Sequence, residues 1–94
     1  MEYQNETISV KELQKILSNI HMSTLIIYLS HCRFAKYKST PFSGAKARYY
    51  LNNDFLDLLY TLLLNRRRYE AAENLQNNFK DIKCLDWGDF ICKS

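Results

Sequence analysis

Glycine and proline are scarce in this chain, with two glycines and one proline among 94 residues. These residues supply the positive φ angles and rigid bends of many turns, so their scarcity leaves little room for long flexible loops. At 47% apolar and 24% charged residues, the composition is typical of a folded protein rather than a disordered one. We predict a single domain that covers residues 1–94.

Cysteine is limited to Cys32, Cys84 and Cys92, an odd number without a CxxC spacing. A disulfide framework or a zinc site is therefore not indicated, and we expect reduced thiols. The two histidines form no nucleophile and base spacing with the cysteines, and the chain has no glycine-rich phosphate loop. The sequence predicts no enzyme, no metal site, no cofactor and no small-molecule substrate.

Long apolar runs are also missing. The longest one, residues 56–64, is interrupted by Asp57 and is followed closely by three arginines. This run is too short to span a bilayer. Residues 1–6 lack the basic and apolar regions of a signal peptide. We therefore expect a cytoplasmic protein without membrane contact.

Acidic residues are absent between Glu12 and Asp54, although the whole chain has a net charge of only +3. Six cations fall in that interval, which gives it a charge of +6: Lys15, Arg33, Lys36, Lys38, Lys46 and Arg48. Such a field favours polyanions, because lysine and arginine displace the counterions condensed on phosphates. The alternative is that these are ordinary solvated charges on an exposed hairpin.

Two short helices joined by a turn are predicted at the start of the chain. Ser9 and Glu12 have the spacing of a capping box, so a helix should begin at Val10, and apolar residues recur at helical spacing up to Ile20. Ser23 can cap a second helix that runs to about Cys32. We expect these helices to share a leucine core with a third, later helix: Leu13, Leu17, Leu25, Leu29, Leu58, Leu59 and Leu62.

The remaining chain predicts a hairpin, a helix and a tail. Residues 34–51 alternate apolar and basic side chains around turn residues 41–44, which indicates a basic hairpin. Asn52 or Asn53 can cap a helix over residues 53–79, either continuous or broken near Asn65. Residues 80–94 form a tail that we expect to pack on the core. The predicted fold is mainly α with a small β-hairpin.

This order of elements is that of a winged helix-turn-helix, and three short motifs carry the resemblance. Residues 8–13 (ISVKEL) resemble the first helix of MerR-type regulators and phage excisionases, and residues 23–25 (STL) resemble the start of their second helix. Residues 48–59 resemble the exit of the wing and the following helix. The resemblance spans residues 8–64 and implies a helix-turn-helix over residues 8–33. In contrast to the usual MerR pattern, residues 26–28 (IIY) lack a long polar side chain. A helix this apolar reads base edges poorly, because specific readout needs side-chain donors and acceptors.

The resemblance implies a duplex DNA partner and a set of contact residues. Thr24, Tyr28 and His31 would face the groove, and the hairpin cations would bind phosphates: Lys36, Lys38, Lys46 and Arg48, with Arg33 beside them. The alternatives are a partly buried aromatic for Tyr28, a helix-end residue for His31, and for Arg48 an ion pair with Asp54 or Asp57. Residues 66–68 (RRR) are expected to form a solvated collar, with one arginine paired to Glu70 or Glu73.

Two functions from different classes fit these features. One is a small DNA-binding regulator of phage or mobile-element type, similar to a repressor or excisionase. The other is a phage-encoded inhibitor of the anti-CRISPR kind, which binds a host protein complex that handles nucleic acid. In both cases we expect a homodimer, because four residues of the predicted third helix and its continuation offer more apolar surface than a three-helix core under a hairpin can cover: Leu63, Leu64, Tyr69 and Phe79.

Overall fold

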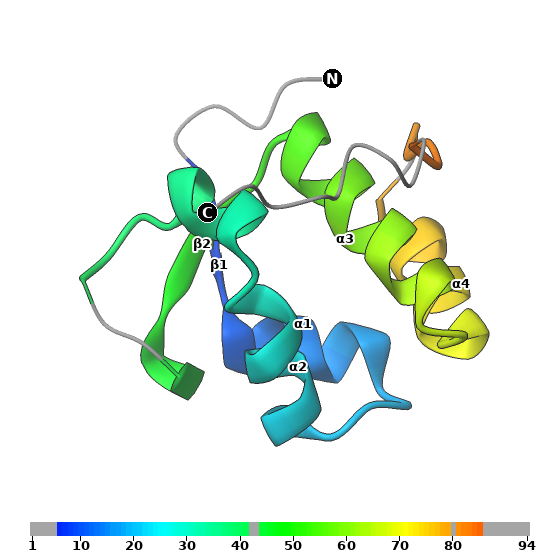
Figure 1. Cartoon of the computed structure of the whole chain (residues 1–94), viewed down its shortest axis with the longest axis horizontal. Helices are drawn as coiled ribbons and strands as arrows, with labels where there is room; N and C mark the ends of the chain where they lie inside the picture. The colour runs from blue at the N-terminus through cyan, green and yellow to red at the C-terminus, as the bar shows by residue number, and fades with distance from the viewer. Residues whose placement is uncertain (1–5, 42–43, 80, 86–94) are drawn as a thin grey trace.

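Helices dominate the structure, a computed structural model that describes residues 6–41, 44–79 and 81–85 (Figure 1). Within these ranges, four α-helices surround a leucine-rich core, and a two-stranded antiparallel sheet lies at one side. α1 contacts both α2 and α4, and α4 also contacts α3. The prediction of a mainly α domain with a small antiparallel β element is confirmed. No helix in the described ranges is long and apolar enough to cross a membrane.

The first helix begins as its capping box predicts. α1 spans Val10–Leu17, and the Ser9 hydroxyl accepts a hydrogen bond from the Glu12 N–H at 3.1 Å. The Glu12 carboxylate in turn accepts from the Ser9 N–H at 3.1 Å. The helix ends earlier than the predicted apolar stripe, because Ser18 takes a positive φ of 58°. Ile20 is buried, but it lies in the loop after the helix.

The second helix, α2, spans Met22–Leu29, so its predicted bounds are corrected at both ends. His21 is the N-cap and makes no side-chain capping bond, whereas Ser23 lies inside the helix. At the other end, the Ser30 hydroxyl donates to the Ile27 carbonyl at 2.6 Å, and the helix stops before Cys32. A serine hydroxyl that bonds to a helical carbonyl competes with the next backbone bond, which favours termination here.

The predicted hairpin over residues 34–51 is largely wrong. Cys32–Tyr37 forms a 3₁₀ helix, η1, and Gly44–Lys46 forms a second one, η2. A bridge between Lys38 and Tyr49 joins the two ends of the intervening loop in the manner of a hairpin, and beside it the Ser39 N–H donates to the Arg48 carbonyl at 2.8 Å. Burial explains the change, because Phe34 and Tyr37 are both in the core. Residues three apart share a face in a 3₁₀ helix but point to opposite faces in a strand.

The strand partner of residues 48–50 is the segment that precedes α1. β1 (Thr7–Ser9) pairs antiparallel with β2 (Arg48–Tyr50), and Ile8 lies opposite Tyr49. Both of these side chains are buried. The sheet thus fastens the start of the chain to the segment that leads into α3.

A break separates the third and fourth helices, which decides between the two alternatives. α3 spans Asn53–Asn65, and the Asn52 side chain accepts from the Phe55 N–H at 2.8 Å as its N-cap. α4 spans Tyr69–Asn78. Between them, Arg67 has a φ of 61°, a left-handed conformation that a continuous helix does not contain.

Phe55 lies at the centre of the core. Its ring meets Phe34 edge to face at 5.7 Å and stacks on Tyr49 at 5.5 Å. The seven leucines predicted to form the shared core are all buried, at 6% exposure or less: Leu13, Leu17, Leu25, Leu29, Leu58, Leu59 and Leu62. Their helical spacing therefore identified the inward faces correctly.

The start of the tail packs on α3, as predicted. Ile82 is buried, and the Leu85 N–H donates to the Thr61 hydroxyl at 2.7 Å. The Lys83 N–H donates to the Asp57 carboxylate at 2.9 Å. These two hydrogen bonds hold residues 81–85 against α3. The rest of the tail, residues 86–94, lies outside the described residues.

The cysteines correct one expectation. Cys84 is an exposed free thiol, in line with the prediction. Cys32 is disulfide-bonded, so the expectation of a reduced thiol is wrong at this position. The sequence could not show this, because disulfide partners are selected by the distance between Cβ atoms in the folded chain and not by spacing along it.

Candidate nucleic-acid interface

Two arginines lie against the exposed side of α2. The Arg68 Nε donates to the Tyr28 hydroxyl at 3.2 Å, and the guanidinium of Arg66 lies over the Tyr28 ring, 5.9 Å from its centroid. Both arginines come from the break between α3 and α4, which we call the arginine turn (residues 66–68). A tyrosine between two guanidinium groups places concentrated positive charge beside a helix that has none of its own.

Backbone bonds explain why the arginine turn has this shape. The Arg67 N–H donates to the Leu64 carbonyl at 3.0 Å, and the Arg68 N–H donates to the Leu63 carbonyl at 2.8 Å. Together with the positive φ of Arg67, they fold the three arginines into one tight turn. In the described ranges no carboxylate pairs with these arginines, so the expected ion pair with Glu70 or Glu73 is wrong. Glu70 instead accepts from the Asn19 amide.

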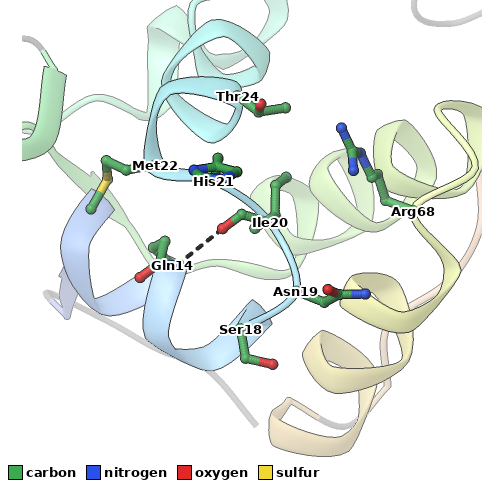
Figure 2. A pocket seen from close by; sticks show the side chains of 8 residues that line it. All are labelled: Gln14, Ser18, Asn19, Ile20, His21, Met22, Thr24 and Arg68. Carbon is green, nitrogen blue, oxygen red and sulfur yellow. Dashed lines mark hydrogen bonds between the residues drawn. The ribbon is translucent and has the colours of Figure 1, made fainter.

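A hollow of about 540 Å³ opens between the arginine turn and the start of α2 (Figure 2). Figure 2 shows Arg68 at one side of the hollow, with Thr24 and His21 at the other. Polar groups dominate its lining, which comprises Gln14, Ser18, Asn19, Ile20, His21, Met22, Thr24 and Arg68. A polar, wide and cationic hollow is suited to hydrated anionic groups rather than to an apolar ligand.

Amide side chains hold the loop at the floor of this hollow. The Gln14 amide donates to the Ile20 carbonyl at 3.0 Å, the bond drawn in Figure 2. From α4, the Asn74 amide donates to the Leu17 carbonyl at 2.8 Å and to the Ser18 hydroxyl at 3.1 Å. These bonds fix the turn between the two helices, and therefore the position of α2 relative to α4.

The three residues predicted on one side of the second helix separate in the structure. Thr24 lines the hollow and Tyr28 binds Arg68, so these two lie together. His31 is not part of α2. Its Nδ1 accepts from the Arg33 N–H at 3.2 Å, which makes it the N-cap of η1, and it lines another hollow with Lys38. Its predicted grouping with Thr24 and Tyr28 is therefore wrong, and it caps the start of η1 rather than the end of a helix.

The cations of the predicted hairpin do not line one hollow, because that hairpin is replaced by two 3₁₀ helices. Lys36 lines a hollow with Arg33 and Asp54, whereas Lys38 lines the one beside His31. Lys46 is exposed on η2. The prediction of a single patch of hairpin cations therefore needs revision.

Arg48 is held by contacts inside the chain. Its Nε donates to the Thr7 hydroxyl at 2.9 Å, and its Nη2 lies 3.6 Å from the Glu12 carboxylate. The ion pair is thus formed with Glu12 and not with Asp54 or Asp57. The pKa of Glu12 is lowered mainly by the hydrogen bond from the Ser9 backbone, then by the Ser9 hydroxyl, and to a smaller extent by Arg48.

The predicted pairing residues differ in exposure. Leu63 is fully buried in the core, so its assignment to an interface is wrong. Phe79 is half-buried and packs on the core. Leu64 and Tyr69 line a hollow of about 550 Å³ between α3 and α4 together with Tyr60. Tyr69 is 62% exposed. The exposed apolar surface is therefore smaller than the sequence suggests, because Leu63 and most of Phe79 do not contribute to it.

Comparisons with models of protein families, with curated proteins and with solved structures found no match. Within the described ranges, no three histidine, cysteine, aspartate or glutamate side chains come together in a group that could hold a metal ion. The candidate site therefore rests on geometry. Sequence reasoning missed the contact between the arginine turn and α2, although the arginine run itself was a visible signal.

Proposed function

We propose that this protein is a small, non-enzymatic DNA-binding regulator of phage or mobile-element type. The observation that carries the proposal is the position of Arg66 and Arg68 on Tyr28, which puts two cations along the exposed side of α2. In a helix-turn-helix the second helix enters the major groove, and flanking cations bind the phosphates on its edges. The arginine turn has the position and charge for the second of these roles.

The chemistry of α2 limits how it can read a sequence. Its eight residues, MSTLIIYL, contain no charged side chain. Thr24 and Tyr28 supply hydroxyl groups, which bond to bases or phosphates less selectively than a bidentate arginine or asparagine. We therefore expect phosphate contacts to supply most of the affinity, so that binding is weak and depends strongly on salt.

A fluorescence anisotropy titration of a labelled duplex at several salt concentrations tests this function. Replacing both Arg66 and Arg68 with Gln should weaken binding and reduce the slope of log affinity against log salt by about 2, because each phosphate contact contributes about 1. The matched control replaces two exposed lysines elsewhere, Lys11→Gln with Lys83→Gln. An absence of duplex binding by the wild-type protein at low salt would contradict the proposal.

An inhibitor of a host nucleic-acid-handling complex is the second candidate, and one observation favours it. Ile27 is 67% exposed on α2, the highest exposure of any large apolar residue in the described part. An exposed isoleucine on an uncharged helix suits a protein partner better than a DNA groove. Ile27→Ala should abolish capture of such a complex from the natural host, whereas salt-dependent duplex binding should survive this change.

Assembly and location complete the proposal. We propose a homodimer that pairs through the hollow lined by Tyr60, Leu64 and Tyr69, which would place two α2 helices in one assembly. We also propose that the protein acts in the cytoplasm, where either partner is found. A sedimentation test of the dimer is described in the Discussion.

A further inference from the structure

Arg33 carries a buried donor that lacks an acceptor. Its Nε is shielded from solvent and has no hydrogen-bond partner in the described part of the chain. The backbone of Arg33 is bonded to His31, but no ion pair joins its guanidinium to a described carboxylate. Shielding a cationic donor without an acceptor is unfavourable, and such a group calls for an explanation. Because Nε alone among the guanidinium nitrogens is both shielded and without a partner, the Nη groups of Arg33 are the ones that an incoming anion can reach.

The 3₁₀ geometry of η1 brings a second cation to the same side. A 3₁₀ helix has three residues per turn, so side chains three apart project in the same direction. Arg33 and Lys36 are three apart, and both line a hollow of about 200 Å³. Its volume corresponds to roughly six or seven water molecules at liquid density. A strand over this segment, as the sequence suggested, would have pointed the two cations to opposite faces.

The walls of this hollow are fixed by the core. The Lys36 Nζ lies 5.2 Å from the centroid of the Tyr37 ring, a cation–π contact that orients the ammonium group. Tyr37 is itself held edge to face against Phe55 at 5.9 Å. Leu58 and Leu85 supply the apolar part of the lining. The two cations therefore project from a rigid support rather than from a loop tip.

We propose that Arg33 and Lys36 form an oxyanion site that binds a phosphate group of a nucleic-acid backbone. The two Nη groups of a guanidinium also point parallel N–H bonds outward, and this end of the group matches two oxygens of a phosphate. Lys36 adds a second positive charge at the same hollow. The assignment of the phosphate to nucleic acid rests on the proposed function, whereas the oxyanion chemistry of the site does not.

Asp54 sets the strength of this site. Its carboxylate lines the same hollow, so it repels an incoming anion and lowers the net charge there from +2 to +1. Asp54→Asn keeps the shape of the side chain but removes the charge. The site hypothesis therefore predicts opposite effects for two neighbours: loss of Arg33 or Lys36 weakens anion binding, and loss of the Asp54 charge strengthens it.

The first experiment follows the arginine Nε–H resonances by NMR while inorganic phosphate is added at constant ionic strength. The Arg33 resonance should shift in a saturable manner, and Asp54→Asn should reach half-saturation at a lower phosphate concentration. Arg33→Gln and the exposed Lys36→Gln should lose the saturable response of the remaining resonances near the hollow. Lys11→Gln, an equal charge change on α1, should bind phosphate as the wild type does.

The second experiment repeats the titration with a duplex of roughly 20 base pairs, about two helical turns. Lys36→Gln should reduce the salt slope by about 1, because one phosphate contact is removed. If phosphate shifts Arg33 but the duplex does not bind, the oxyanion site stands and the DNA-binding function fails. If the duplex binds while phosphate leaves Arg33 unmoved and Lys36→Gln has no effect, the site is overturned and the function stands.

Discussion

Glu12 connects three segments of the chain through one carboxylate. It accepts from the Ser9 backbone at the start of α1 and from the Ser9 hydroxyl, and it lies 3.6 Å from Arg48 of β2. Arg48 in turn bonds to Thr7 of β1. A single side chain thus caps a helix and helps to join it to the sheet. The ionised form of Glu12 is the one that makes these contacts.

The lowered pKa of Glu12 predicts a pH-dependent contribution to stability. A carboxyl group whose pKa falls on folding stabilises the fold fully at pH values above its ordinary pKa, here 4.5. That stabilisation is lost as the pH falls through the folded-state pKa. Ser9→Ala should therefore cost about 1 kcal/mol at pH 7, typical of a lost N-cap. The cost should decrease as pH falls from 7 to 3 and below, because Glu12 becomes protonated as pH falls through its lowered pKa, and the reciprocal bond is then weaker.

Urea denaturation of wild type and Ser9→Ala at both pH values gives this difference. Ser23→Ala is the matched control, because Ser23 is an exposed serine inside α2 and not its cap. It should change the free energy of unfolding little at either pH. An equal cost for Ser9→Ala at pH 7 and at a pH low enough to protonate Glu12 would show that Glu12 takes no part in the cap.

At the scale of elements, the arginine turn decides what α2 presents to a partner. A continuous helix would have spread residues 66–68 around its surface and carried α4 away from α1. The break at Arg67 instead brings α4 back onto both α1 and α3. The same break delivers Arg66 and Arg68 to Tyr28. The backbone conformation of one residue therefore couples the packing of α4 to the charge beside α2.

Arg67→Gly tests the cost of that conformation. Glycine adopts positive φ without the steric penalty that other residues meet, so the variant should gain about 0.5 to 1 kcal/mol in free energy of unfolding. Arg66→Gly, at a φ of −89°, is the control and should lose stability, because glycine adds flexibility at a position that needs no positive φ and the contact of Arg66 with the Tyr28 ring is lost. Chemical denaturation measures both. Destabilisation by Arg67→Gly equal to that of Arg66→Gly would contradict the argument.

At the scale of the whole molecule, charge and apolar surface are arranged around the break between α3 and α4. The arginine turn is followed directly by Tyr69 and by two exposed glutamates, Glu70 and Glu73, which line the hollow with Tyr69. A twofold axis through this region would bring the arginines of one copy near the glutamates of the other. Apolar contact from Tyr69 and this charge complementarity both favour pairing.

Sedimentation equilibrium tests the dimer. The wild-type protein should be dimeric at roughly tens of micromolar, the weak end of specific interfaces. Tyr69→Lys should shift it to a monomer, because the change removes the exposed ring and adds charge beside the arginine turn. Tyr50→Lys, at the other exposed tyrosine, should leave the dimer intact. A wild-type monomer at this concentration would contradict the pairing proposal.

The sequence by itself determined the features that depend on residues three or four positions apart in the chain. The capping box fixed the start of α1, the choice of Asn52 or Asn53 as cap placed the start of α3 to within one residue, and leucine spacing identified the buried helix faces. Each is a local bond or a local periodicity, so no knowledge of distant segments is needed. The basic character of the middle of the chain was equally plain from composition.

Only the tertiary structure decided how distant segments meet. Arg68 and Tyr28 are 40 residues apart, and Arg48 and Thr7 are 41 apart. Sequence spacing does not encode such pairs, because they depend on how whole elements pack. The same holds for η1, where burial of Phe34 and Tyr37 together overrode an alternating pattern that suggested a strand. The candidate binding surfaces arise from these long-range contacts, since packing placed cations from one segment beside the exposed groups of another.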